Sequence, residues 1–245
     1  LSDLTLGMKC GSSDTTSGLV PNPAMGIASD LLVEAGGISI LGEVTEFIGA
    51  EHLLAEHAKD ADVAEAILAL VHRMENRAKA IGVDMRGGQP TAGNIKGGLT
   101  TIEEKSLGAI AKAGKAPIQA VYEYGIPPAV KGLVVMDSPG REPEILTGLA
   151  AAGCNIIAFS TGRGAPQGFP FVPVLKITGN EVTWTRLCDH MDLYVGSVIS
   201  GEETLEQAGG RILHELVETA SGKLTKAEIC GYTRAMDIYV TGPVL

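Results

Sequence analysis

The strongest constraint on the fold of this chain is a strand–helix–strand pattern in its second half. Residues 132–137 form an apolar run that predicts a buried strand, Ser138-Pro139-Gly140 predicts a turn, residues 143–152 have helical spacing, and residues 155–159 predict a second strand. A helix that connects two such strands implies that they are parallel and that the crossover is right-handed. The chain is therefore expected to contain a parallel sheet covered by helices.

The rest of the chain repeats the same kinds of element. Helical spacing predicts helices at residues 24–35, 62–81, 102–113 and 203–220, and short apolar runs predict strands at residues 38–41 and 172–177. Irregular structure is predicted for residues 7–26, up to the first helix, and for residues 83–98, and an extended tail for residues 239–245. These patterns predict an α/β fold with a mostly parallel sheet and helices on both faces, in Rossmann-like layering. We expect one domain over residues 1–245, with two closely joined lobes, about 1–128 and 129–245, as an alternative.

The composition excludes some classes of function. A formal net charge of −10, without a dense lysine and arginine cluster, argues against nucleic-acid binding. No apolar run reaches the roughly 18 residues of a membrane span. Four cysteines without a C-x-x-C spacing predict reduced thiols and a cytoplasmic protein. The first residues, Leu1-Ser2-Asp3-Leu4, are neither a signal peptide nor a natural initiation site, so we expect the chain to be part of a longer polypeptide.

A glycine-rich stretch at residues 93–108 is the first candidate for a binding site. It contains the hydroxyls of Thr100 and Thr101, either of which can cap a helix that begins there, followed by Lys105. Free backbone N–H groups, the helix dipole, two hydroxyls and a lysine together favour a carboxylate or a phosphate. A glycine-rich loop that only caps the helix explains the same residues equally well.

Acidic residues gather where the predicted strand at residues 38–41 ends. Glu43, Glu46 and His52 follow that strand closely, and carboxylates with an imidazole suit Mg²⁺, Mn²⁺ or Fe²⁺. Cys10, in a glycine-containing loop, is either a soft ligand or a small buried residue. The alternative to a metal site, which we weigh more heavily, is a solvated acidic helix start.

Two cationic residues are candidates for work on an acid. Lys105 lies one helical turn beyond Thr101 and is either a general base or a solvent-exposed lysine. Arg163 lies between two glycines at the end of the predicted strand at residues 155–159, where a guanidinium can bind a carboxylate in a bidentate manner.

Seven motifs occur in order along nearly the whole chain. They are C-G-S-S-D at residues 10–14, N-P-A-M-G at 22–26, E-V-T-E at 43–46, G-A-E-H-L-L at 49–54, G-N-I-K-G-G-L-T-T-I-E-E-K-S-L-G at 93–108, D-S-P-G at 137–140 and F-S-T-G-R-G at 159–164. Together they resemble the large, carboxy-terminal part of the altronate/galactarate dehydratase family, which includes the large subunit of sulfolactate sulfo-lyase. Ser138 and Ser160 replace threonines of the family pattern and keep the hydroxyl, whereas Ile95-Lys96 departs from it.

The resemblance implies a cytoplasmic lyase that dehydrates a sugar acid, such as altronate or galactarate, to a 2-keto-3-deoxy acid with Fe²⁺ or Mn²⁺. In this chain it implies Cys10, Glu43, Glu46 and His52 near the metal, and Lys105, His52 and Arg163 as catalytic residues. The acid would be held by Ser12, Asp14, Asn94, Thr100, Thr101 and Arg163. It also implies two partners besides the substrate, an amino-terminal segment or small subunit of the same enzyme and further copies of the chain in a homo-oligomer.

Three alternatives to a sugar-acid dehydratase stay open at this point. One is a sulfo-lyase that eliminates sulfite from sulfolactate. Another is a fragment that binds a ligand or supports assembly and leaves catalysis to the missing segment. A nucleotide-binding domain is disfavoured, since neither a Walker nor a G-x-G-x-x-G spacing follows a strand at residues 93–101.

Overall fold

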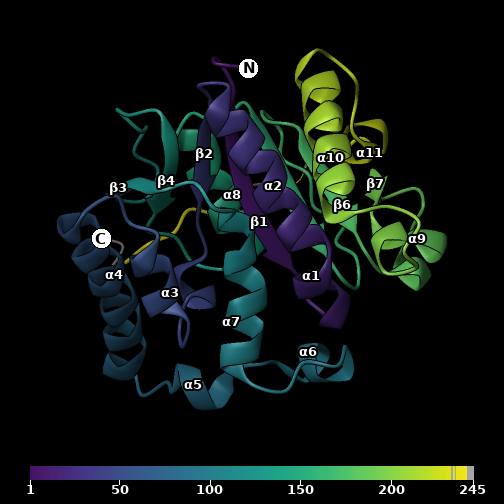
Figure 1. The fold of residues 1–245 in the computed structure, drawn as a ribbon. Helices are drawn as coiled ribbons and strands as arrows, with labels where there is room; N and C mark the ends of the chain where they lie inside the picture. The colour runs from purple at the N-terminus through teal and green to yellow at the C-terminus, as the bar shows by residue number, and fades with distance from the viewer. Residues whose placement is uncertain (233, 235, 242–245) are drawn as a thin grey trace.

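The structure, a computed structural model that describes residues 1–232, 234 and 236–241, is built on a parallel β-sheet (Figure 1). Within the described residues the sheet has seven strands in the order β3-β4-β2-β1-β5-β6-β7, and every neighbouring pair is parallel. The strands are β1 Thr5–Gly11, β2 Ile38–Leu41, β3 Ile118–Tyr122, β4 Gly132–Met136, β5 Ile156–Thr161, β6 Val174–Thr178 and β7 Leu193–Tyr194. The predicted α/β fold is confirmed, and the one sheet contains strands of both predicted lobes.

Two hydrophobic clusters cover the two faces of the sheet. Side chains alternate along each strand, so Leu133 and Val135 of β4 enter one cluster while Val134 and Met136 enter the other. Burial on both faces explains why a strand such as β4 is a continuous apolar run.

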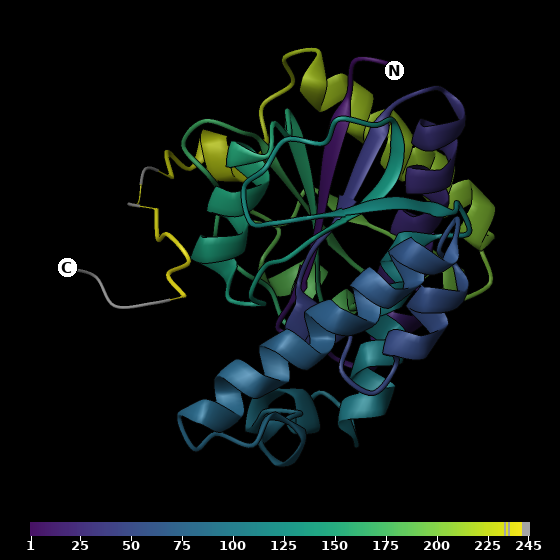
Figure 2. The same cartoon turned by 90° about the vertical axis from the view of Figure 1, so that its left-hand side faces the viewer.

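Helices pack on both clusters (Figures 1 and 2). On the first face, α2 (Pro21–Glu34) and α10 (Leu205–Ala220) lie side by side, and α4 (Ala61–Ala80) covers the sheet near β3. On the second face, α8 (Glu142–Ala151) contributes Ile145, Leu146 and Leu149. The shorter helices are α1 Thr15–Leu19, α3 Glu51–Glu56, α5 Met85–Gly88, α6 Ala92–Lys96, α7 Ile102–Ile110, α9 Glu181–Arg186 and α11 Lys226–Ile229, with 3-10 turns η1 Val44–Glu46, η2 Ala111–Ala113 and η3 Gly196–Val198.

The prediction of an irregular segment at residues 7–26 is wrong, because β1, the central strand, lies there with α1 and the start of α2. Lys9 concealed the strand, since a lysine is rarely buried. Here its ammonium bonds Glu43 and lies 4.7 Å from the centre of the Phe159 ring. Pro21 occupies the first turn of α2, where a missing N–H costs nothing, so it begins the helix.

The other expectations have mixed outcomes. The helices at residues 62–81 and 203–220 and the strands at residues 38–41 and 172–177 are confirmed within a few residues. Residues 83–98 contain the short helices α5 and α6 instead of a continuous loop. Of the predicted extended tail at residues 239–245, residues 242–245 lie outside the described part of the chain. None of the described helices has both the length and the apolar character that a membrane crossing requires.

A glycine in α2 should be essential for the packing of that helix. A Cβ on Gly26 would lie 2.4 Å from the carbonyl oxygen of Ala111 and 2.9 Å from the amide nitrogen of Gly114, both backbone atoms. We expect Gly26→Ala to lower the free energy of unfolding by about 1–3 kcal/mol, measured by urea denaturation.

The matched control is Gly210→Ala in α10, where a Cβ would meet no atom within 4 Å. That change should raise the free energy of unfolding by about 0.5–1 kcal/mol through helix propensity. Equal stability of the Gly26→Ala variant and the wild type would contradict the close contact of α2 with η2.

Candidate active site

A cavity of about 440 Å³ lies at the carboxyl ends of β1, β2 and β4. Its walls come from the end of β1, the turn after β2, the turn before α8, the connection that contains α5 and α6, and α7. The described residues that line it are Cys10, Gly11, Ser12, Ser13, Thr45, Glu46, Met85, Gln89, Thr91, Asn94, Lys105, Pro139, Gly140, Arg141 and Glu142. Open parallel sheets bind ligands at this edge, and cavities of this size hold small metabolites.

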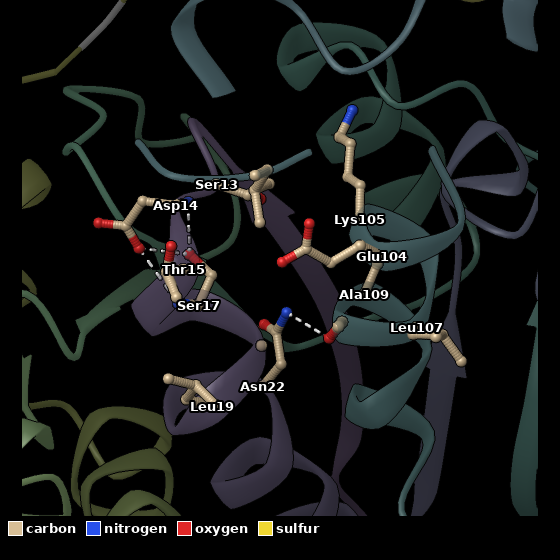
Figure 3. Close-up of a pocket in the computed structure, with 13 residues that line it drawn as sticks. Ser13, Asp14, Thr15, Ser17, Leu19, Asn22, Glu104, Lys105, Leu107 and Ala109 are labelled. Atoms are coloured by element: carbon tan, nitrogen blue, oxygen red, sulfur yellow. Dashed lines mark hydrogen bonds between the residues drawn. The ribbon is translucent and has the colours of Figure 1, made fainter. Parts of the chain in front are cut away.

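A second cavity, of about 280 Å³, lies between α1 and α7 (Figure 3). Two lining residues, Ser13 and Lys105, are shared with the first cavity, so the two adjoin. Leu19 and Leu107 make part of it apolar, and Lys105 extends away from both of them. Lys105 therefore stands at the boundary between the two cavities.

Lys105 is held by two side chains at this boundary. Its Nζ lies 3.1 Å from Oε1 of Glu46 and donates to Oε1 of Gln89 at 2.8 Å. The side chains of Lys105 and Glu46 are 11% and 13% exposed, so both are largely shielded and still reach the cavity. This pair places an ammonium and a carboxylate in contact on the cavity wall.

Below the cavity, Lys9, Cys10, Glu43 and Lys112 form a buried polar cluster, which we call the floor cluster. Lys9 Nζ donates to Glu43 Oε1 at 3.0 Å, and Lys112 Nζ donates to Glu43 Oε2 at 2.7 Å. The Cys10 amide donates to the same Oε2 at 2.8 Å, and Lys112 Nζ lies 2.9 Å from Cys10 Sγ. Both oxygens of Glu43 are thus bonded within the chain, and Glu43, Lys9 and Lys112 are fully buried.

Burial and charge act in opposite directions on this cluster. Burial alone would raise the pKa of Glu43, but the ammonium groups of Lys112 and Lys9 outweigh it and hold that pKa below its ordinary value. Burial would also lower the pKa of Lys112, but the charge of Glu43 and the hydrogen bonds to Cys10 and Glu43 raise it. Burial, with the charge of Glu43 beside it, raises the pKa of the Cys10 thiol to about 11. At neutral pH the cluster is an ionic Lys–Glu–Lys group that contacts a protonated thiol.

Backbone strain gathers at the same place. Among the described residues, the non-glycine residues with positive φ are Ser12, at 48°, and Glu43, at 67°. A non-glycine residue in the left-handed conformation costs about 1–3 kcal/mol of conformational free energy, and it persists only where contacts with its surroundings impose that conformation. For Glu43 those surroundings include Ser138, whose Oγ accepts its amide at 2.8 Å. Both strained residues follow the carboxyl ends of neighbouring strands, β1 and β2.

The structure brings only some of the sequence-predicted residues together. Cys10, Ser12, Glu46, Asn94 and Lys105 line the first cavity, and the second cavity also contains Asp14. His52, Thr100, Thr101 and Arg163 are exposed and line neither cavity. The Arg163 guanidinium instead donates to the Gly93 carbonyl at 3.1 Å.

Several predicted binding residues have structural bonds. Asp14 caps α1 and accepts from Asn180 at 2.7 Å. Asn94 belongs to the capping box of α6 and donates to the Ser13 carbonyl at 2.9 Å. Thr101 caps α7 by accepting the amide of Glu104, whose carboxylate bonds Thr100. These hydrogen bonds give Asp14, Asn94, Thr100 and Thr101 each a structural role. Their contact with substrate stays a prediction.

The predicted metal ligands do not form a shared site in this structure. Both oxygens of Glu43 and the sulfur of Cys10 are in contact with ammonium groups, Glu46 pairs with Lys105, and His52 faces solvent on α3. Among the described residues, no group of three or more His, Cys, Asp or Glu side chains is arranged to hold a metal ion. The donor set therefore does not fit a metal ion in this arrangement.

The sequence reasoning missed Lys9, Lys112, Gln89, Arg141 and Glu142. Arg141 could have been found, since it follows the turn after the predicted strand at residues 132–137 and so lies at the ligand-binding edge. Its Nη1 donates to Asp237 at 3.0 Å and also bonds Glu144. Lys112 gave no such signal, because only the tertiary fold brings it to Glu43, 69 residues earlier in the chain.

Comparison with known proteins gives a consistent result. Residues 1–243 match the family described as D-galactarate/Altronate dehydratase, C-terminal. The chain is 38% identical to galactarate dehydratase (L-threo-forming) of Escherichia coli (strain K12), over 99% of this chain and 46% of that protein. It is 41% identical to (2R)-sulfolactate sulfo-lyase subunit beta of Chromohalobacter salexigens, over 95% of this chain and 60% of the relative. Altronate dehydratase of Bacillus subtilis (strain 168) is 37% identical over 93% of this chain and 46% of its own length. The chain thus spans about half the length of these curated relatives.

The floor cluster gives a stability prediction. Glu43→Gln removes the carboxylate that Lys9 and Lys112 share and leaves Lys9 only the longer contact with Glu142 Oε1 at 3.8 Å, so we expect a loss of about 3–5 kcal/mol in the free energy of unfolding at pH 7. Glu215→Gln is the control, because Glu215 pairs with Lys223 at the surface and its loss should cost less than about 1 kcal/mol. Urea denaturation measures the free energy of unfolding of both variants. A loss in Glu43→Gln as small as that in Glu215→Gln would contradict the buried ion pairs of Glu43.

The wild type and the Glu43→Gln variant together also test the direction of the shift in the pKa of Glu43. A carboxylate whose pKa is lowered on folding contributes its full stability above the unfolded pKa, about 4.3 for glutamate, and loses it as the pH falls through the folded pKa. The stability difference between wild type and Glu43→Gln should therefore shrink on acidification below that value. A difference that grows towards low pH would contradict the shift.

Proposed function

Since this chain belongs to the D-galactarate/altronate dehydratase family, we propose that it carries the catalytic cavity of a carbon–oxygen lyase that dehydrates a sugar acid. The proton next to the substrate carboxylate is removed, the neighbouring hydroxyl leaves as water, and a 2-keto-3-deoxy acid is formed. Galactarate and altronate are the proposed substrates, because these acids appear in the names of the relatives.

The observation that carries this proposal is the Lys105–Glu46 pair on the wall of the cavity at the carboxyl ends of the strands. A proton next to a carboxylate is weakly acidic, so the reaction needs a positioned base and a cation near the charge that develops. Lys105 and Glu46 supply a proton-transfer pair, and Arg141 supplies a second cation on the same cavity.

Lys105 and Glu46 have complementary roles in this scheme. The ammonium of Lys105 first loses a proton, and the Glu46 carboxylate at 3.1 Å is the acceptor in contact with it. The Lys105 amine then removes the proton from the substrate, and as an ammonium it returns a proton to the leaving hydroxyl. Lys105 is favoured over His52 for this role, because His52 lies outside both cavities.

Arg141 is proposed to bind the substrate carboxylate. Arg141 is a lining residue of the cavity, and its exposed guanidinium pairs with Glu144 and Asp237, whereas Arg163, the arginine predicted from the sequence, donates to Gly93 and does not line the cavity. A guanidinium presents paired N–H donors that match a carboxylate. Ser12 adds a hydroxyl on the same cavity.

The divalent metal, Fe²⁺ or Mn²⁺, is proposed from the family resemblance alone. The donor residues of this chain do not fit a shared site in the present arrangement, so no step of the scheme is routed through a metal.

The rest of the enzyme is also part of the proposal. Because the chain spans about half of its relatives, we propose that a further segment or subunit completes the enzyme. The homo-oligomer and the cytoplasmic location are proposed from the family resemblance alone. The name of one relative, (2R)-sulfolactate sulfo-lyase subunit beta, supports an enzyme of more than one subunit.

Sulfite elimination from sulfolactate is the second candidate. It is favoured by 41% identity to the sulfo-lyase subunit beta, of which the chain covers 60%. Both reactions begin with removal of the proton next to a carboxylate, so the Lys105–Glu46 pair serves either. The leaving group separates them, and assays with galactarate, altronate and sulfolactate that detect 2-keto acid and sulfite decide between the two.

Removal of the lysine should abolish turnover without loss of the fold. We expect Lys105→Met to lower kcat by about 10²–10⁴-fold, because the base is lost. The control is Lys223→Met, a surface lysine that pairs only with Glu215 among described residues and should leave kcat unchanged. Retention of full activity by a folded Lys105→Met variant would exclude Lys105 as the base. A wild type that binds these acids but turns none over would favour a ligand-binding or assembly role.

The two arginines should differ in their effect on substrate affinity. Arg141→Met is expected to raise KM by about tenfold or more with a smaller change in kcat, since a charge-assisted contact contributes about 1.5–3 kcal/mol. Arg163→Met is the matched comparison and should change KM less, because its side chain lies outside the cavity. Steady-state kinetics with the preferred acid measures KM for both variants. A larger rise in KM for Arg163→Met than for Arg141→Met would indicate that Arg163 binds the substrate carboxylate.

A further inference from the structure

The floor cluster connects the segments that build the cavity. Lys9 and Cys10 belong to β1, Glu43 follows β2, and Lys112 belongs to the turn η2 that continues α7. Lys9 Nζ also donates to the Cys10 carbonyl at 2.8 Å and to the Gly140 carbonyl at 3.3 Å, in the turn before α8. The two ammonium groups thus hold together β1, the turn after β2, η2 and the turn before α8. Each of these segments lines the cavity or lies next to a segment that does.

We propose that Lys9 and Lys112 are positioning residues for the proposed reaction, an inference that rests on the proposed function. Their ammonium groups fix Glu43 and Cys10, and through these the carboxyl ends of β1 and β2, while Lys9 bonds the turn at Gly140 directly. The walls that carry Ser12, Glu46 and Arg141 are thereby held in register around the substrate.

Lys112 takes the place of a bridging cation in this arrangement. Its Nζ contacts Cys10 Sγ at 2.9 Å and Glu43 Oε2 at 2.7 Å, the sulfur and one carboxylate that the sequence predicted to share a metal. An ammonium with three donors can bridge a thiol and a carboxylate without a metal. Cys10 is itself part of the cavity lining, so the bridge ends at the site.

A purely stabilising role explains the cluster less well. Buried ion groups seldom stabilise a fold more than apolar residues of similar volume do, because desolvation opposes the attraction between the charges. This cluster also holds Glu43 in a left-handed conformation, φ 67°, which adds strain. Strain and buried charge meet directly below the proposed reaction site, where a fixed geometry affects the rate.

Lys112→Met tests the proposal, since the methionine side chain matches that of lysine as far as Cε and lacks the ammonium. Amide hydrogen exchange, read by mass spectrometry, reports the segments 10–13, 43–46 and 139–142 without any substrate. We expect about tenfold faster exchange in these segments in the folded variant, and a fall of about 10²-fold in kcat that exceeds the change in KM.

Lys176→Met is the matched control. Lys176 is also fully buried in a strand, β6, but its Nζ approaches Pro166 and no described residue of the floor cluster. The control should alter exchange around β6 and leave the three segments as in wild type. If Lys112→Met does not fold, Cys10→Ala removes one end of the bridge and keeps the pair with Glu43, and it should loosen the segment 10–13.

The outcomes separate this proposal from the proposed function. Exchange in the three segments that stays at the wild-type rate, or that rises uniformly over the chain, would overturn the positioning role. Loosening of these segments in wild type by a chelator would also overturn it, because a metal would then form the bridge. A wild type without turnover on any of the acids would reject the proposed function, while the exchange data would still decide the positioning role.

Discussion

The ion group around Glu43 is the interaction on which the geometry of the cavity depends. A carboxylate that is fully buried can stay ionised only if opposite charges and hydrogen-bond donors surround it. Lys9, Lys112 and the Cys10 amide provide them, and each comes from a segment next to the cavity. If β1, β2 or η2 moved apart, a buried charge would be left without a partner. The cost of that separation ties the positions of the three segments to one another.

The fold places this polar group where the apolar layers end. In the middle of the sheet, hydrophobic clusters cover both faces. Towards the carboxyl edge, the chain leaves the sheet in turns, and the residues there no longer have to match the pleat. Ser12 and Glu43, with their positive φ, lie at this transition. The regular core thus fixes where the irregular loops begin, and the loops carry the ionisable side chains.

The sequence predicted the strands and helices whose buried residues form a regular apolar pattern. β2 and β4 are continuous apolar runs between turn residues, and α4 and α10 have clear helical spacing, so their patterns are local. β1 was missed because its fold depends on Glu43, 34 residues beyond Lys9, and a buried lysine is recognised only once that partner is known. β3 lies at the sheet edge with half-buried residues, which weakens its pattern.

The site divides in the same way. Cys10, Glu46 and Lys105 were found because they lie in distinctive motifs, and all three line one cavity. Lys112 could not be assigned, since its importance comes from a contact with Glu43, 69 residues earlier in the chain. Arg141 was overlooked, although its place after the turn that follows β4 puts it at the ligand-binding edge of the sheet.

The contrast between the buried floor cluster and the more exposed lining residues of the cavity bears on substrate choice. The relatives include dehydratases and a sulfo-lyase at similar identity, 37–41%, and their named reactions differ in the group that leaves. Removal of the proton is common to both proposed reactions, and the residues proposed to move it, Glu46 and Lys105, lie in η1 and α7, the segments next to the floor cluster. Recognition of water or sulfite as the leaving group requires differences in size and charge, which a rigid buried cluster cannot vary without loss of its pairing. Such differences are tolerated in the connection that holds Gln89 and in the turn that holds Arg141, because Gln89 is only partly buried and Arg141 is exposed. The choice of substrate is therefore expected to reside in these two segments, with proton transfer set by the residues beneath them.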